Sequence, residues 1–412
     1  MKIQLLSAAA ASFALFGAGA PALMAASADG GIAVHELSDD GKQSSFRGNP
    51  KSRLPMRKNP PRANQLRSPS RRDGVPGSSV DKGRKNDAYG TAKWAYTTSL
   101  VKLGKKPKEK DQNAAVSAVP FLNAGKLFMR FGNSNYVCSG SMIGKGIVVT
   151  AAHCIANWGQ GKSGIADEVY FIPGATKRAN STSSGPVGRW KAKDIVYPTC
   201  YINGTCKNKS GGVVSSNDIA IVVLGGKKNK LPWKKGVGYY DYGWNGYGFT
   251  TGSSLASSKS MAQITQLGYP AAIGDTSSNR GGAMIRTDSP AMYSLEAAGV
   301  KNLVWGSSQT GGSSGGPELV NFGTKPNYGP GSSAGSKANS SLVIGVTSWG
   351  YVSTTVNLQG ASWFGQNDEF DQPSYTDGAG FNWGAGNIGA LMRYTCGKGS
   401  SYLGLQAKGW CR

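Results

Sequence analysis

The sequence lacks several features that would assign it to a class at once. Only 17% of its 412 residues are charged and only two are histidine. After residue 28 no apolar run approaches the roughly 18 residues needed to cross a bilayer, so no membrane span is expected. None of the six cysteines forms a C-x-x-C pair, which excludes the usual zinc-finger and iron–sulfur patterns. The 60 glycines show no three-residue period, which excludes a collagen-like chain. The glycines indicate many turns between short elements. The length of 412 residues is enough for about two or three domains.

The first 28 residues have the pattern of an export signal. Lys2 precedes an apolar, alanine-rich stretch over residues 5–24, and Ala26-Ser27-Ala28 matches the small-x-small cleavage pattern. The alternative, a membrane anchor, is disfavoured because alanine and glycine make this stretch only mildly apolar. We therefore expect a secreted protein, extracellular or periplasmic, that starts at Asp29. An even number of cysteines in such a compartment predicts three disulfides.

The net charge of +24 is concentrated in one region. Residues 41–110 contain nineteen basic and four acidic side chains, a net of +15, and five prolines lie within residues 47–72. Such a segment buries too little apolar surface to offset the entropy of ordering it, so we expect residues 41–110 to be unstructured. A disordered basic pro-segment or linker over residues 29–113 is the favoured interpretation. The alternative is an arm that binds anionic surfaces or nucleic acid by charge.

From about residue 114 the sequence changes to many short β-type runs. Residues 126–131 alternate with period two, and residues 147–150, 219–224 and 342–346 are buried-type apolar runs. Clusters of Gly, Asn and Ser separate them, which is typical of an all-β barrel or sandwich. The only late helical candidate covers residues 388–394.

Three polar residues stand out against this β-rich background. His153 follows an apolar run in the motif TAAHC, Asp218 opens another in NDIA, and Ser314 lies in the glycine-rich turn GGSSGGP of residues 311–317. The other histidine, His35, has no plausible partner near it in the sequence. Each of the three residues alone has an ordinary structural explanation. Their occurrence together, in the order His, Asp, Ser, is much harder to explain as an accident.

With Thr347-Ser348-Trp349-Gly350 as a fourth motif, residues 114–412 resemble the chymotrypsin-like (trypsin-fold) serine peptidases, and most closely their secreted bacterial members. The resemblance implies two six-stranded antiparallel β-barrels, over residues 114–235 and 236–412, with a short C-terminal helix. The catalytic groups would lie in the cleft between the barrels. The expected substrate is a protein or peptide, and no metal or cofactor is expected. The oligomeric state does not follow from the sequence.

The resemblance also implies a role for each candidate residue. His153 would take the proton of the Ser314 hydroxyl as that oxygen attacks the scissile carbonyl, and Asp218 would orient the imidazole. The backbone N–H groups of Gly312 and Ser314 would form the oxyanion hole. The residues implied on the substrate side are Ser308, Ser348, Trp349 and Gly350, with Ser348 also supporting the aspartate. Three disulfides are expected, the first from the resemblance and the others from sequence proximity: Cys138–Cys154, Cys200–Cys206 and Cys396–Cys411.

Activation and specificity depart from the common pattern of that family. Ser313 stands where many members have an aspartate that pairs with a freed N-terminus, so activation by an N-terminal ammonium is not expected. Cleavage at Arg71-Arg72 or Lys105-Lys106 would remove the basic segment and leave a start between about residues 73 and 120. Residues 323–341 and 352–377 have the composition of insertions.

Ser308 occupies the position expected at the base of the specificity pocket, which binds the substrate residue before the scissile bond. Its neutral hydroxyl favours an apolar or aromatic residue, because a charged one would be desolvated without compensation. The alternative is a basic residue, selected if acidic side chains of the second insertion fold into the pocket. Those side chains are Asp368, Glu369, Asp371 and Asp377.

The favoured function is a secreted serine endopeptidase. The alternative is a catalytically degenerate protein of the same fold that binds anionic surfaces or nucleic acid through its basic N-terminal segment. The intact set of His153, Asp218 and Ser314 favours the enzyme, because a cleft freed from catalysis usually loses at least one of the three.

Overall fold

The computed structural model describes sixteen stretches of the chain. They are residues 31–37, 51–52, 56–57, 88–90, 95–101, 116–176, 185–207, 209–210, 214–226, 231–247, 261–274, 277–279, 281–295, 300–324, 339–351 and 357–411. The predicted export signal of residues 1–28 lies outside them.

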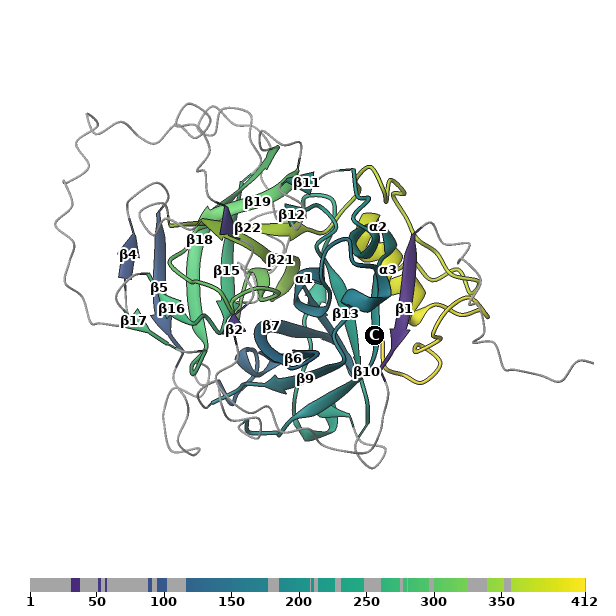
Figure 1. The fold of residues 1–412 in the computed structure, drawn as a ribbon, viewed down its shortest axis with the longest axis horizontal. Helices are drawn as coiled ribbons and strands as arrows, with labels where there is room; N and C mark the ends of the chain where they lie inside the picture. The colour runs from purple at the N-terminus through teal and green to yellow at the C-terminus, as the bar shows by residue number, and fades with distance from the viewer. Residues whose placement is uncertain are drawn as a thin grey trace, which may run out of the picture.

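The first six-stranded antiparallel barrel is built by the first half of the peptidase-like region (Figure 1). Its strands are β6 (Ala124–Phe131), β7 (Ser134–Gly144), β8 (Ile147–Thr150), β9 (Glu168–Pro173), β10 (Trp190–Pro198) and β13 (Ala220–Leu224). They pair in the order β9-β6-β7-β8-β13-β10, and β9 also pairs with β10, which closes the barrel. The apolar runs predicted as strands are the buried strands β6, β8 and β13.

The second barrel repeats this arrangement with later strands. They are β15 (Met261–Gly268), β18 (Ile285–Leu295), β19 (Lys301–Gly306), β20 (Pro317–Val320), β21 (Leu342–Tyr351) and β22 (Leu358–Trp363). Their order is β15-β20-β21-β22-β19-β18, and pairing between β15 and β18 closes the barrel. Trp305 and Leu303 lie in its apolar core. The expected all-β architecture with two six-stranded barrels is confirmed.

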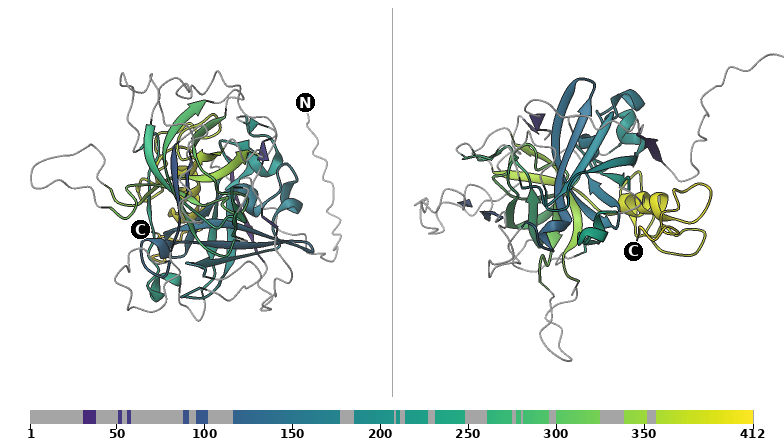
Figure 2. Two further views of the ribbon diagram at one scale, coloured as in Figure 1. Left: turned by 90° about the vertical axis from the view of Figure 1, so that its left-hand side faces the viewer. Right: turned by 90° about the horizontal axis from the view of Figure 1, so that it is seen from below.

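Helices are short and few in the described residues. α1 (Ala152–Ile155) and α2 (Thr199–Asn203) lie in connections between strands of the first barrel. α3 (Gly386–Cys396) is the expected C-terminal helix. α3 packs against β1, β10 and β13 on the outer side of the first barrel, as the right-hand view of Figure 2 shows. Within the described ranges, no helix has the length and apolarity to cross a membrane.

Minor elements lie outside the barrel strands. The short strands are β11 (Lys209–Ser210), β12 (Val214–Ser215), β14 (Asp241–Tyr242), β16 (Ala272–Ile273) and β17 (Ser277–Ser278). β11 pairs with β12, β16 pairs with β17, and β14 pairs with β21. The 3-10 turns are η2 (Phe121–Asn123), η3 (Gly161–Gly164) and η4 (Pro232–Lys235).

Parts of the N-terminal region add strands to both barrels. β1 (Ile32–Glu36) extends the first barrel along β10, and β5 (Tyr96–Leu100) lies along β18 of the second, with β4 (Ala88–Gly90) beside it (Figure 1). β2 (Lys51–Ser52) pairs with β7, and β3 (Met56–Arg57) pairs with β21. The expectation that residues 41–110 are unstructured is therefore wrong for β2, β3, β4 and β5. A segment of unfavourable composition can still be ordered where an existing sheet offers an unpaired edge.

Candidate active site

The pairing of two neighbouring strands brings His153 and Asp218 together. β8 and β13 are antiparallel, with Thr150 opposite Ala220. His153 follows the end of β8 in α1, and Asp218 precedes the start of β13, so both residues emerge at the same end of the sheet. The Nδ1 atom of His153 lies 2.7 Å from Oδ2 of Asp218, and both side chains are buried. The structure therefore joins two of the candidate residues directly.

Asp218 is held by two further hydrogen bonds. The backbone N–H of His153 donates to Oδ1 at 2.8 Å, and the hydroxyl of Ser348 donates to Oδ2 at 2.5 Å. Ser348 comes from β21 of the second barrel, so the contact crosses between barrels. A buried carboxylate needs such donors in place of water. They hold its oxygens in a fixed orientation towards the imidazole.

The turn that carries Ser314 packs directly against the segment that precedes His153. A Cβ added to Gly315 would lie 2.0 Å from Oγ1 of Thr150 and 2.9 Å from the backbone nitrogen of Ala151. Gly315 also has a φ of +74°, which favours glycine. Its N–H donates to the carbonyl of Thr347, next to Ser348, at 2.8 Å. Ser314 therefore lies between the histidine segment and the strand that supports Asp218.

Ser139 ties the same turn to the first barrel. Its N–H donates to the carbonyl of Ser314 at 2.7 Å, and its hydroxyl donates to the carbonyl of Gly312 at 2.8 Å. The hydroxyl also accepts the N–H of Tyr269 at 2.9 Å. Ser139 was not found by sequence reasoning, because a serine within a strand carries no local signal of this role.

Gly312 adopts a conformation that few other residues reach. Its φ is +103°, and an added Cβ would lie 2.6 Å from the carbonyl oxygen of Tyr269. The carbonyl of the preceding residue, Gly311, accepts the N–H of Ala271 at 2.8 Å. Because the peptide is planar and trans, that bond also fixes the direction of the Gly312 N–H, on the opposite side of the same peptide.

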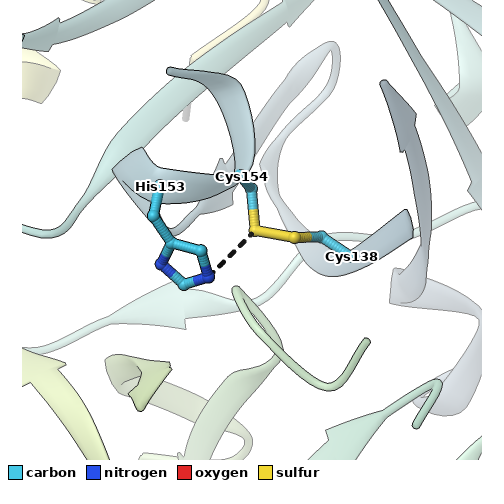
Figure 3. Close-up of side chains that lie close together, drawn as sticks. All are labelled: Cys138, His153 and Cys154. Carbon is cyan, nitrogen blue, oxygen red and sulfur yellow. Dashed lines mark hydrogen bonds between the residues drawn. A yellow bond between two sulfur atoms is a disulfide. The ribbon is translucent and has the colours of Figure 1, made fainter. Parts of the chain in front are cut away.

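The three expected cysteine pairs form disulfides, and one adjoins His153. Cys138 is bonded to Cys154, Cys200 to Cys206, and Cys396 to Cys411. Figure 3 shows the first beside the imidazole, with Nε2 of His153 3.9 Å from the sulfur of Cys154. Although Cys138, His153 and Cys154 cluster closely enough to hold a metal, both sulfurs are in the disulfide and provide no thiolate. The bridge ties the histidine helix to β7.

The second insertion supports the aspartate side of the site. The amide of Asn217, next to Asp218, donates to Glu369 at 2.7 Å and accepts from Asn367 at 2.8 Å. Asn387 of α3, beyond the insertion, donates to the carbonyl of Ser216 at 3.0 Å. Glu369, considered above as a residue that could enter the specificity pocket, thus lies beside Asn217. None of these contacts has a local sequence signal.

A buried polar network lies beneath the serine turn. The hydroxyl of Ser313 donates to the carbonyl of Thr310 at 2.8 Å, and the Gln359 amide donates to Gln309 at 2.6 Å. Thr347 donates to Oε1 of Glu318 at 2.6 Å, whereas Oε2 has no partner among the described residues. Burial raises the pKa of Glu318 well above its usual value, against a smaller effect of the Thr347 hydrogen bond. The side-chain partners of Ser313 are thus the Thr310 carbonyl and, at 3.4 Å, the Gln359 amide.

A buried lysine links the two barrels on the other side of the turn. Lys126 of β6 donates to the carbonyl of Gly281 at 2.6 Å, and the Gly281 N–H donates to the carbonyl of Pro270. Burial lowers the pKa of Lys126 to about 7. Residues 126–131 alternate in polarity, but residues 126–129 of β6 are all buried, because the second barrel covers one face of the strand.

The residues expected on the substrate side fall in different environments. The Trp349 side chain is buried, and its indole N–H donates to Asn302 at 3.1 Å. Gly350 pairs with Gln359 on one edge of β21 and with Met56 of β3 on the other. Ser308 is 7% exposed and lies 3.3 Å from the hydroxyl of Thr98, in β5.

Comparison with known proteins gives the following matches. The family model described as Trypsin matches residues 122–362. The protease Anisep from Arthrobacter nicotinovorans is 24% identical, over 61% of this chain and 93% of that chain, with a TM-score of 0.43. The thermostable serine protease AL20 from an extremophilic microorganism is 20% identical, over 59% and 91%, with a TM-score of 0.43. A Glu endopeptidase is 19% identical, over 60% and 87%, with a TM-score of 0.39. No curated protein matches the sequence.

Proposed function

Because the chain belongs to the trypsin family, whose model matches residues 122–362, we propose that it is an exported serine endopeptidase acting through an acyl-enzyme on Ser314. One observation carries this proposal: the buried contact between His153 Nδ1 and Asp218, made next to the turn that holds Ser314. The three disulfides support export, since such bonds persist in oxidising compartments.

The proposed chemistry begins with proton transfer. Asp218 accepts a hydrogen bond from the Nδ1–H of His153, which keeps the proton on Nδ1 and leaves Nε2 as an acceptor for the hydroxyl proton of Ser314. The Ser314 oxygen attacks the scissile carbonyl carbon, and the electron pair of the C=O bond moves onto its oxygen. Imidazolium forms beside the carboxylate, which stabilises its charge.

The backbone is proposed to stabilise the negative oxygen. The N–H groups of Gly312 and Ser314 would donate to it, and one such donor is worth about 10²–10³ in rate. His153 then gives its proton to the leaving amine as the C–N bond breaks. A water molecule repeats the sequence on the acyl-enzyme and releases the new carboxylate, which regenerates the Ser314 hydroxyl.

The basic N-terminal segment is proposed to cover the substrate edge until it is cleaved. β2 pairs with Tyr136 and Val137 of the first barrel, and β3 pairs with Gly350 and Tyr351 of the second. Gly350 is on the strand edge expected to bind the substrate backbone. Cleavage at Arg71-Arg72 would separate both strands from the rest of the chain, so that only the pairings of β1, β2 and β3 hold them and they can dissociate. Ser313 carries no charge and cannot form an ion pair with a new N-terminal ammonium, so several starts should be compatible with activity.

A covalent probe tests the proposed function. An alkyl fluorophosphonate should label the processed wild-type protein and should not label Ser314→Ala. Ser163→Ala, which removes a surface hydroxyl, is the matched control and should be labelled like wild type. Casein cleavage should follow the same pattern. Equal labelling of wild type and Ser314→Ala, or no labelling of either, would contradict the proposal, and the second result would favour a degenerate cleft.

A further inference from the structure

We propose that β5, from the segment N-terminal to the peptidase barrels, is a permanent part of the specificity pocket, with Tyr96 and Thr98 as the positioning residues behind Ser308. The inference rests on the proposed function and adds to it a source for the pocket base. It places part of the specificity machinery outside the region that the family model matches, residues 122–362.

β5 occupies the part of the β18 edge that β19 leaves unpaired. β19 pairs with residues 291–295 of β18, and β5 pairs with residues 285–288. Ser289 marks the junction, because its hydroxyl accepts the N–H of Gly306 at 3.0 Å and donates to the carbonyl of Ala95 at 2.9 Å. Just after Gly306 the chain turns away from β18 to form residues 307–309, the expected pocket base. β5 lies along β18 at the place that residues 307–309 leave.

The alternation of β5 directs two side chains to this place. Tyr96 and Thr98 are buried, whereas Thr97 between them is exposed. The hydroxyl of Thr98 lies 3.3 Å from that of Ser308 and 3.1 Å from that of Thr287. Burial raises the pKa of Tyr96, and a hydrogen bond with Ser308 offsets part of that effect. The Ser308 hydroxyl is therefore oriented by two hydroxyl groups of β5.

The chemical character of the pocket base follows from these contacts. The groups around Ser308 are the neutral hydroxyls of Tyr96, Thr98 and Thr287 and the amide of Gln309, which donates to Thr287 at 3.0 Å. A base made of neutral groups leaves a charged side chain without an opposite charge to compensate for its lost hydration. The substrate residue before the scissile bond is accordingly apolar or aromatic.

The same contacts constrain maturation. The N–H of Val101 donates to the carbonyl of Met284 at 3.0 Å, so the bonded stretch runs from Ala95 to Val101. Cleavage at Arg71-Arg72 leaves this stretch attached to the enzyme. Cleavage at Lys105-Lys106 would cut it from the barrel and leave it held by the sheet alone. Residues 95–101 should be present in the active protein, and mass spectrometry of the active species would detect them.

The decisive experiment places a charge behind Ser308. In Thr98→Asp the new carboxylate lies next to the Ser308 hydroxyl, where it would face a basic side chain in the pocket. The ratio of kcat/KM for Arg to that for Phe before the scissile bond should rise about tenfold or more, because a close opposite charge in a partly buried site is worth at least that factor. Thr98→Asn is the uncharged control of similar shape. Ser99→Asp adds the same charge to the same strand on the opposite face.

The outcomes separate this inference from the proposed function. The inference is supported if the Arg-to-Phe ratio of kcat/KM rises in Thr98→Asp but not in Thr98→Asn or Ser99→Asp. An active Thr98→Asp whose ratio equals those of Thr98→Asn and Ser99→Asp overturns it, and leaves the catalytic assignment intact. Loss of labelling by fluorophosphonate in the processed wild-type protein would instead count against the function itself.

A second measurement uses the wild-type chain, in case Thr98→Asp does not fold. Peptidyl phosphonates that carry Phe or Gly at the tested position are coupled to the enzyme, and hydrogen exchange of residues 95–101 is compared. Slower exchange with Phe than with Gly supports contact between the pocket and β5. Identical exchange in the two complexes would overturn it.

Discussion

Replacement of the Asp218 carboxylate by an amide of the same shape is the sharpest perturbation of the proposed site. Asp218 accepts from three donors: Nδ1 of His153 and the Ser348 hydroxyl at Oδ2, and the His153 backbone N–H at Oδ1. Asparagine offers one oxygen and one NH2 group. It therefore cannot accept hydrogen bonds at both positions.

Either orientation of an asparagine side chain leaves one mismatch. If its oxygen accepts the backbone N–H, its NH2 group faces Nδ1, the imidazole proton moves to Nε2, and His153 can no longer accept the Ser314 proton. If the amide is reversed, its NH2 group faces the backbone N–H of His153. Both groups are donors, and they would meet at the 2.8 Å separation that the hydrogen bond to Oδ1 now spans. The lost bond and unsatisfied donors cost about 3–5 kcal/mol in a buried site. The working orientation should then be populated about 10²–10⁴-fold less, and kcat should fall by that factor.

Steady-state kinetics with a chromogenic peptide test the predicted fall in kcat. Asp218→Asn should lower kcat with little change in KM, at an active-site concentration measured with the fluorophosphonate. Ser348→Ala removes one donor and leaves both His153 bonds, so its kcat should fall by about tenfold at most. A folded Asp218→Asn enzyme with kcat within tenfold of wild type would refute the reasoning.

Three further predictions concern buried groups near the turn. Glu318→Gln should match the melting temperature of wild type near pH 4 and exceed it by a few degrees near pH 8. Burial raises the pKa of Glu318, so wild type loses stability as pH rises above the ordinary value, and equal melting temperatures at both pH values would contradict this. Lys126→Met should be more stable than wild type by about 2–4 kcal/mol near pH 6, with a smaller difference near pH 9, because the lowered pKa makes the native state resist protonation. Denaturant titrations near pH 6 and pH 9 measure this stability difference. A difference that does not change with pH would exclude the lowered pKa of Lys126 as its cause. Gly312→Ala should lower kcat about 10²–10³-fold, since the added Cβ would approach the Tyr269 carbonyl and displace the N–H, and a loss below tenfold would contradict that role.

Local patterns in the sequence determined much of the framework. The apolar runs of residues 147–150 and 219–224 correspond to β8 and β13, and residues 388–394 lie within α3. These elements could be predicted because side-chain period and β-branching act over a few neighbouring residues. Two of the disulfides join cysteines at separations of 6 and 15 residues, where proximity in the chain already limits the choice of partner. The three candidate catalytic residues were found in short motifs, each at the end of an element or in a glycine turn.

Contacts between distant segments were decided only by the tertiary structure. The composition of residues 41–110 predicts no order, yet β5 is held because β19 leaves part of the β18 edge unpaired. Lys126 is buried because a second barrel, far along the chain, covers its strand. The contacts of Ser139 with Gly312 and of Asn217 with Glu369 likewise join residues more than 150 positions apart. Which polar side chains are buried and which distant residues they bond depends on the surfaces that meet after folding, and a local sequence pattern does not identify those partners.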